Sequence, residues 1–212
     1  TVHQRFQPWY FFIPILAVGM LPWLFTMIGA LPDAWRRRAR DKRFDPLLFA
    51  LIWAGFIFVF FSASGSKLPS YILPVFPALA LLVAVRLSTV TGRALAWQLA
   101  PVAVLAAGGI AATPFAVNLA SANIPAGLYM AQTPWLYAAG AALLAGMLAA
   151  IAFAWRGKVQ AAIVAAALAG LATTQLLVTS EDALSPAHST YHLAQQLAPH
   201  LKPAAPFYSV RT

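Results

Sequence analysis

Long apolar stretches separated by short polar segments constrain this chain more than any other feature. Of its 212 residues, 61% are hydrophobic and 9% are charged, whereas a soluble domain carries about 25% charged residues. A helix that crosses a bilayer needs about 20 mostly apolar residues. Six stretches reach or approach that length: 8–31, 46–63, 70–86, 94–117, 134–155 and 159–179. We therefore expect an all-α, polytopic membrane protein with about six transmembrane helices.

The composition changes after the sixth stretch. We expect residues 1–179 to form a transmembrane domain and residues 180–212 to lead into a soluble C-terminal domain, because PFYSV at 206–210 has the pattern of a strand. The chain begins with Thr1 and shows no signal peptide, so we expect it to be part of a longer protein. It contains no cysteine, which excludes disulfides and thiolate metal sites.

The basic residues alternate between loops and predict the orientation in the membrane. Three loops hold ten of the fourteen: Arg36, Arg37, Arg38, Arg40, Lys42, Arg43, Arg86, Arg93, Arg156 and Lys158. We expect these loops to face the cytoplasm, and both chain ends and residues 62–74 to face the opposite side. The run at 36–43 lies between two apolar stretches, so contact with anionic lipid head groups explains it better than nucleic acid does.

The segment SASGSKLPSYILP, residues 62–74, separates two apolar stretches on the non-cytoplasmic side. Tyr71 follows Lys67 by four residues, and Pro69 favours an extended conformation at Leu68. An ammonium with three donors and a phenolic hydroxyl suit a phosphate, and lipid head groups supply phosphates at this depth. The alternative is that Lys67 is an interfacial anchor whose ammonium snorkels to water. The residues alone leave both interpretations open.

A resemblance to a known family rests on three segments. FFSASGSKLPSYILPVFPALALLVA contains the lysine–proline–tyrosine pattern, QPWYFFIPILAVGMLPW at 7–23 is an aromatic entry into a proline-broken helix, and HLAQQLAPHLKPAAPFYSV covers 192–210. Together they resemble the bacterial 4-amino-4-deoxy-L-arabinose transferases that act on lipid A. These enzymes belong to the GT-C membrane glycosyltransferases and are related to protein O-mannosyltransferases. By this resemblance the chain corresponds to the C-terminal membrane half.

The resemblance implies an inverting pentosyltransferase that moves the sugar from undecaprenyl phosphate to a phosphate of lipid A. The reaction takes place at the periplasmic face of the bacterial inner membrane and gives resistance to polymyxin and other cationic peptides. The implied partners are the undecaprenyl phosphate-linked sugar donor, lipid A and membrane lipids, with no nucleic acid.

The resemblance also implies roles for individual residues. Tyr71 matches the family's tyrosine that contacts the carrier-lipid phosphate, and Lys67 matches the motif lysine. The catalytic Asp and a Glu and a His that bind a divalent metal are expected before Thr1. No catalytic or metal-binding residue is therefore assigned within this chain.

Three other groups of polar residues are candidates for a role. Arg5 is a candidate phosphate contact, with an interfacial anchor as the alternative. His188 and His192 have a spacing that can hold zinc, but no Glu adjoins them in an HExxH pattern, so a surface helix is favoured. Glu181 and Asp182 are interpreted as the polar end of the sixth stretch.

Two other classes of function remain as alternatives. Proline-broken helices near a basic residue also occur in secondary transporters, but transporters usually place ionisable groups within their spans, and these stretches hold almost none. A scaffold subunit without a site is the third interpretation. The donor sugar and the acceptor follow from the family resemblance alone.

Overall fold

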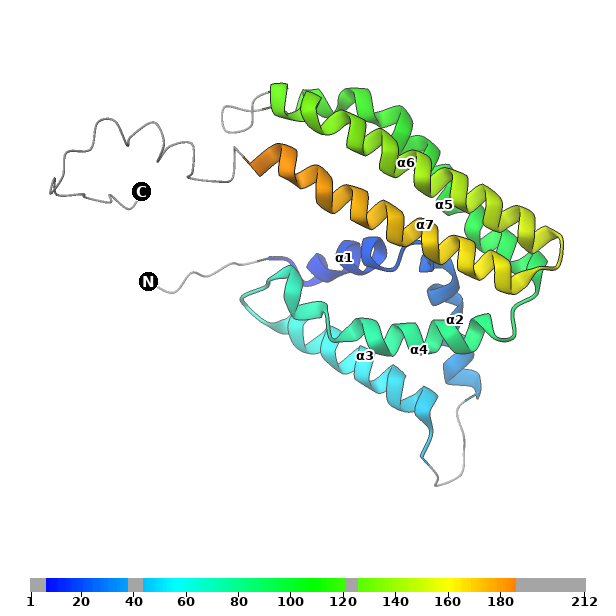
Figure 1. Cartoon of the computed structure of the whole chain (residues 1–212). Helices are drawn as coiled ribbons and strands as arrows, with labels where there is room; N and C mark the ends of the chain where they lie inside the picture. Colours follow the sequence, from blue (N-terminus) through cyan, green and yellow to red (C-terminus); the bar gives the residue numbers. More distant parts are fainter. Residues whose placement is uncertain (1–6, 38–43, 121–125, 186–212) are drawn as a thin grey trace, which may run out of the picture.

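The chain folds into helices joined by short connections (Figure 1). The computed structural model describes residues 7–37, 44–120 and 126–185. The elements are η1 (Trp9–Phe11), α1 (Phe12–Gly19), α2 (Leu24–Arg37), α3 (Pro46–Ala63), η2 (Pro69–Ile72), α4 (Val75–Leu87), α5 (Gly92–Ala112), η3 (Thr113–Leu119), α6 (Ala126–Trp155), α7 (Val159–Ser180) and η4 (Glu181–Leu184). The predicted all-α membrane class is confirmed. Nearly all of the predicted soluble segment, 180–212, lies outside the described residues.

The number of membrane-crossing helices is close to the prediction. Four helices in the described residues are long and apolar enough to cross a bilayer: α3, α5 with η3, α6, and α7 with η4. The bent pair formed by α1 and α2 can supply a fifth crossing. The predicted stretch 70–86 contains the 3-10 turn η2 and the 13-residue helix α4, which is too short to count as a full span.

The stretch 8–31, predicted as a proline-broken helix, is broken sharply. The chain forms two helices here, which meet at 113° across a break at residues 20–23. Pro22 lies in the break and has no N–H group to continue the hydrogen-bond ladder of α1. The second helix also runs further than predicted, to Arg37.

The fifth predicted stretch begins earlier than expected. Helix α6 starts at Ala126 and has 30 residues, so part of the charge-free segment 118–133 is helical rather than loop. Pro134 lies inside this helix without ending it. Its neighbour Thr133 donates a hydrogen bond to the carbonyl of Tyr129 (2.9 Å), a local side-chain bond of the kind that helps helices tolerate irregularity in lipid.

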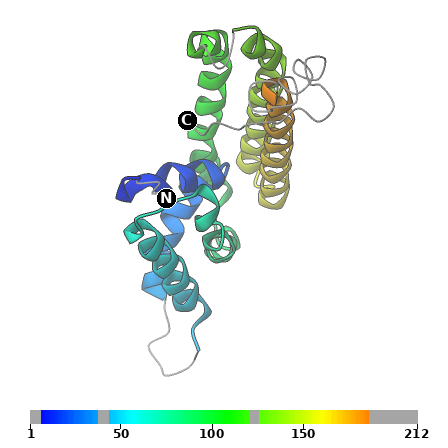
Figure 2. The ribbon, with the colours of Figure 1, turned by 90° about the vertical axis from the view of Figure 1, so that its left-hand side faces the viewer.

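The helices form two groups, each with its own apolar core (Figures 1 and 2). Helices α1 to α4 make the first group, in which α4 contacts both α2 and α3. Helices α5, α6 and α7 make the second, with α6 packed against both neighbours. The second core consists mainly of alanines from these three helices. Their small side chains allow the backbones to approach closely, as the Ala-rich sequence predicts.

The groups are joined at the broken first segment, where Leu21, Trp23 and Phe25 pack against the second core. The hydroxyl of Thr26 on α2 donates a hydrogen bond to the side-chain oxygen of Gln98 on α5 (2.8 Å). A Cβ atom built on Gly170 of α7 would lie 2.9 Å from Cδ of Pro22. Gly170 therefore allows α7 to rest directly on the proline that breaks the first segment.

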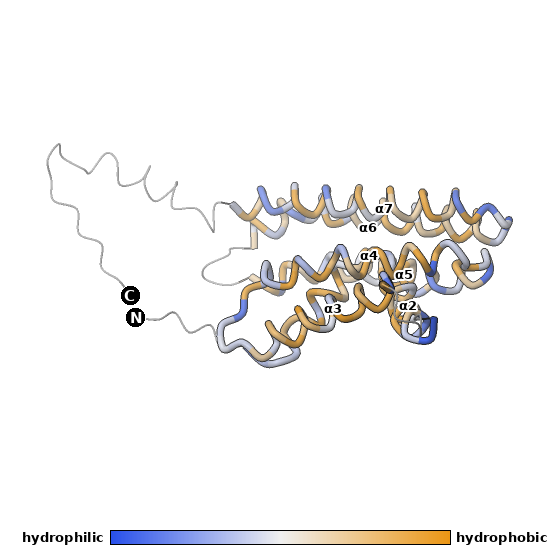
Figure 3. The backbone as a smooth tube through the Cα atoms, turned by 90° about the horizontal axis from the view of Figure 1, so that it is seen from below, coloured by the Kyte–Doolittle hydropathy of each residue, from blue (hydrophilic) through white to orange (hydrophobic). Residues whose placement is uncertain are grey.

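The helix directions agree with the predicted orientation. Residues 64–72, the end of η3 and the end of α7 lie at one end of the molecule, on the left in Figure 1. The turns from α4 to α5 and from α6 to α7 lie at the other end, where Figure 3 shows hydrophilic residues. In the described ranges Lys67 is the single Lys or Arg at the first end, and six lie at the second: Arg36, Arg37, Arg86, Arg93, Arg156 and Lys158.

We predict that Gly146→Ala destabilises the protein. A Cβ atom at this position of α6 would lie 2.2 Å from Cβ of Ala169 on α7, so the two helices would have to separate. Such overpacking typically costs about 1–3 kcal/mol. Gly108→Ala is the control, because a Cβ there meets nothing within 4 Å. Thermal unfolding of the full-length protein in detergent measures both, and equal melting temperatures would contradict this packing.

Candidate functional site

Residues 62–71, here called the polar corner, run from the last turn of α3 into η2. The backbone of Ser64 ends α3 in an extended conformation (φ −64°, ψ 141°). Leu68 is also extended (φ −126°, ψ 145°), which confirms the effect predicted for the following proline. The turn η2 then places Tyr71, whose N–H donates to the carbonyl of Leu68 (3.0 Å).

The ammonium of Lys67 lies inside the polar corner. The residue is 6% exposed, and its Nζ donates hydrogen bonds to the carbonyl oxygens of Ser64 (2.6 Å) and Gln7 (3.1 Å). Burial of this ammonium argues against the alternative of a snorkelling anchor. Because an ammonium has three N–H donors, one remains available after these two bonds. The bond to Gln7 also ties the start of the chain's first helical segment to the corner.

Tyr71 is half-buried beside the same turn. Its ring packs against Phe61 of α3 with 5.3 Å between ring centroids. No hydrogen bond joins its hydroxyl to any residue that the structure describes. The ring contact with Phe61 therefore fixes the position of Tyr71, and its hydroxyl group is available for a ligand.

Ser62 adds a polar atom that sequence reasoning did not single out. Its Oγ is buried and has no hydrogen-bond partner within the described ranges. A buried hydroxyl without a partner is costly, so the end of α3 has unused hydrogen-bonding capacity. The only signal in the sequence was the serine-rich composition of 62–66.

An apolar groove begins at η2 and follows α1 and α4. Its volume is about 680 Å³, and its lining residues are Pro14, Ile15, Val18, Gly19, Pro69, Ser70, Leu73 and Phe76. A second groove of about 360 Å³ shares Gly19 and Phe76 with the first and extends along α4 to Leu87. A Cβ on Gly19 would lie 2.5 Å from the ring of Phe76, so this glycine lets the ring lie on α1. The first groove reaches Pro69 and Ser70, which directly precede Tyr71 in η2.

Of the other candidate residues, the structure describes Glu181 and Asp182 alone. Arg5, His188 and His192 lie outside the described residues, so their roles stay predictions. Glu181 and Asp182 are exposed in η4 after α7, as a polar helix end should be. In the described parts of the chain, no three His, Asp or Glu side chains gather in a way that could hold a metal ion.

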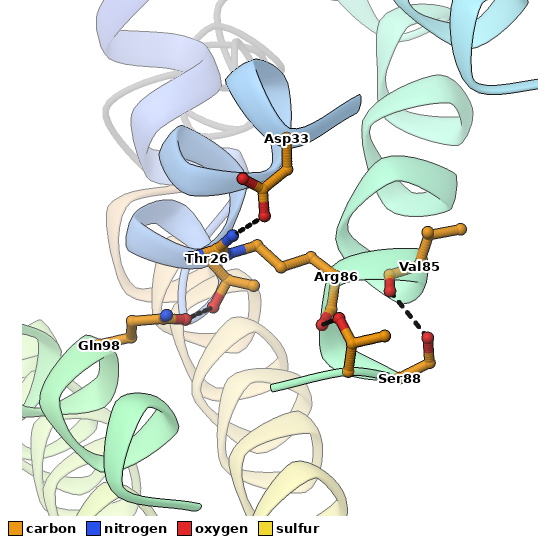
Figure 4. A network of polar contacts seen from close by, with 7 residues as sticks. Thr26, Asp33, Val85, Arg86, Ser88 and Gln98 are labelled. Atoms are coloured by element: carbon orange, nitrogen blue, oxygen red, sulfur yellow. Dashed lines mark hydrogen bonds and ion pairs between the residues drawn. The ribbon is translucent and has the colours of Figure 1, made fainter. Parts of the chain in front are cut away.

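A polar network at the opposite end of the first group was not predicted (Figure 4). Arg86 of α4 forms an ion pair with Asp33 of α2, and its guanidinium lies against the backbone of Gly29, where a Cβ would be 2.8 Å away. The pair fastens α4 to α2, and Thr26 of the same helix continues to α5.

The chain resembles aminoarabinose transferases in both sequence and structure. It is 44% identical over 92 residues to undecaprenyl phosphate-alpha-4-amino-4-deoxy-L-arabinose arabinosyl transferase 2 of Sodalis glossinidius, a match that covers 43% of this chain and 16% of the relative. The Pseudomonas aeruginosa transferase is 43% identical over 79 residues, which cover 37% of this chain and 14% of that protein. No family model matches the chain.

The crystal structure of ArnT from Cupriavidus metallidurans bound to undecaprenyl phosphate matches 99% of this chain with a TM-score of 0.80 and 35% identity. The predicted resemblance is confirmed. The apo structure of the same protein matches equally well, with a TM-score of 0.79 over 100% of this chain. The chain spans 38% of the length of the lipid-bound ArnT structure.

We predict that Lys67→Met lowers the stability of the protein. Methionine keeps the length of the side chain but leaves the carbonyls of Ser64 and Gln7 without their donor, at a cost of about 1–3 kcal/mol. Lys158→Met is the matched control, because Lys158 is exposed and makes no side-chain hydrogen bond at the start of α7. Melting temperatures in detergent provide the comparison. An equal melting temperature for Lys67→Met and wild type would mean that the two bonds contribute nothing.

Proposed function

We propose that this chain is the carrier-lipid side of a membrane glycosyltransferase. The complete enzyme transfers 4-amino-4-deoxy-L-arabinose from undecaprenyl phosphate to a phosphate of lipid A. The main support is the close match over nearly the whole chain to ArnT bound to undecaprenyl phosphate, at 35% identity. The polar corner, with its buried ammonium and free phenol, supplies the chemistry that such a ligand needs. We place this corner at the periplasmic face of the bacterial inner membrane.

Within this proposal, Tyr71 donates its hydroxyl to the phosphate of the carrier lipid. The contact with Phe61 already fixes the ring of Tyr71. The hydroxyl therefore loses little conformational freedom when the lipid binds. Lys67 contributes its positive charge and its third N–H, while its other two N–H groups keep the corner closed on Ser64 and Gln7. Arg5 is a further proposed phosphate contact.

These groups act most strongly in the transition state. The acceptor oxygen of lipid A attacks the anomeric carbon, the bond from that carbon to the phosphate oxygen breaks, and undecaprenyl phosphate leaves with its extra negative charge. Donors that are already fixed beside this oxygen stabilise the developing charge without reorganising. The polar corner therefore stabilises the leaving phosphate. On this proposal, the base that activates the acceptor lies in residues before Thr1, and so do the residues that bind the divalent metal.

The apolar groove along α1 and α4 suits the isoprenoid tail. It starts at Pro69 and Ser70, beside the phosphate-binding Tyr71, and its lining is almost entirely apolar. A carrier lipid with its phosphate at the polar corner can lay its tail on this path without crossing a polar surface. The match to the transferases favours this enzyme over a secondary transporter.

We predict that Tyr71→Phe slows sugar transfer by about 10- to 150-fold in the full-length protein. A hydrogen bond to a charged group contributes about 1.5–3 kcal/mol, and each 1.36 kcal/mol of barrier is a tenfold change in rate. The phenylalanine ring keeps its contact with Phe61, so folding should not change. Transfer from a synthetic carrier-lipid donor to lipid A, followed by mass spectrometry, measures the rate.

Tyr137→Phe is the control for this experiment, because Tyr137 is 39% exposed and lies on α6, in the other helix group. Its transfer rate should equal that of wild type. A wild-type rate for Tyr71→Phe would remove this residue from the site. Absence of any transfer by the wild-type protein with this donor would instead overturn the proposed activity.

A further inference from the structure

Exposed cations and indole rings gather where α5 begins and where α6 turns into α7. Arg93 and Trp97 belong to the first turns of α5, Trp155 ends α6, and Arg156 and Lys158 lie in the turn that follows. All five are exposed, Trp97 to 65% and Trp155 to 51%. We call these five residues the basic–indole surface. It lies at the opposite end of the molecule from the polar corner.

A close backbone contact brings the members of this surface together. A Cβ atom on Gly92 would lie 2.2 Å from the carbonyl oxygen of Ala154, so the start of α5 rests directly on the last turn of α6. The indoles of Trp97 and Trp155 consequently meet edge to face, with 6.4 Å between ring centroids. The guanidinium carbon of Arg93 lies 5.8 Å from the centre of the Trp155 ring, a distance typical of a cation–π contact.

The positive charges of this surface have no acidic partner among the described residues. Asp33 is engaged by Arg86, and Asp45 accepts hydrogen bonds from the first turn of α3. Glu181 and Asp182 follow the far end of α7. The basic–indole surface is therefore complementary to an anion.

The helix ends add to this positive potential. Both α5 and α7 begin here, and neither has an acidic residue in its first turn. The N-terminus of a helix carries a partial positive charge and is normally stabilised by a nearby anion. Here Arg93 and Lys158 occupy positions where carboxylates would be expected, so the side chains increase the positive potential instead of neutralising it.

We propose that the basic–indole surface binds the phosphate head group of an anionic membrane lipid, in the leaflet opposite the polar corner. The exposed indoles lie at the ends of helices long enough to cross the bilayer, which is the depth at which tryptophan is enriched and lipid phosphates lie. An acidic protein would match the charges equally well but would not account for indoles at the membrane boundary. This inference requires only that the helices cross the membrane and does not depend on the proposed sugar transfer.

Native mass spectrometry of the full-length protein tests the proposal. The protein is extracted from nanodiscs that contain phosphatidylglycerol and phosphatidylcholine in equal amounts, and the ratio of the two lipids that stay bound is measured. We expect wild type to retain phosphatidylglycerol preferentially. Each cation near an anionic surface strengthens binding about fivefold, so Arg93→Gln/Arg156→Gln should lower the ratio about 25-fold.

Arg36→Gln/Arg37→Gln is the charge-matched control. These two arginines are also exposed at the same end of the molecule, but they lie on the last turn of a single helix. Because Arg36 and Arg37 belong to the basic run at 36–43, which attracts anionic head groups without a formed site, we expect a smaller loss in this variant than in Arg93→Gln/Arg156→Gln. Equal losses in both variants would show diffuse attraction without a site, and no lipid preference in wild type would show that the surface does not bind lipid; either result overturns the proposal.

Melting temperatures of the variants verify that they are folded. A wild-type rate of sugar transfer by Arg93→Gln/Arg156→Gln separates this proposal from the proposed enzyme activity.

Discussion

Every backbone polar group inside a bilayer must find its partner within the protein, and the rest of this structure follows from that constraint. It explains why the described regular elements are all helices and why the irregular backbone is confined to short connections. The polar corner is such a connection. There a side-chain donor satisfies backbone carbonyls that helical N–H groups would satisfy elsewhere. The ammonium of Lys67 satisfies carbonyls of Ser64 and Gln7 that no N–H group of a helix reaches. The same bonds fix Lys67 in the segment that leads into η2 and Tyr71.

The two helix groups use different means to hold together. In the group of α5 to α7, alanine and glycine bring backbones into direct contact, as at Gly146 and Ala169. In the group of α1 to α4, larger side chains fill the core, and the ion pair of Arg86 with Asp33 fastens α4 to α2. The groups meet at Pro22 and at the Thr26–Gln98 hydrogen bond. The break in the first apolar segment thus provides the surface on which the second group rests.

Sequence reasoning succeeded where one local property decides the outcome. Apolar length predicted the membrane class, the basic residues predicted which helix ends share a side, and Pro69 predicted the extended Leu68. It failed where two distant segments act together. The 113° bend between α1 and α2 brings Pro22 against Gly170, which lies far along the chain. Gln7 is 60 residues from Lys67, and nothing in either segment indicates that they would meet.

The shortness of α4 has a consequence for the membrane itself. With 13 residues it is about 20 Å long, while the hydrocarbon core of a bilayer is about 30 Å thick. A hydrophobic segment that is too short is accommodated by thinning of the surrounding lipid. The acyl chains next to α4 would then compress, and the lipid surface would dip toward η2.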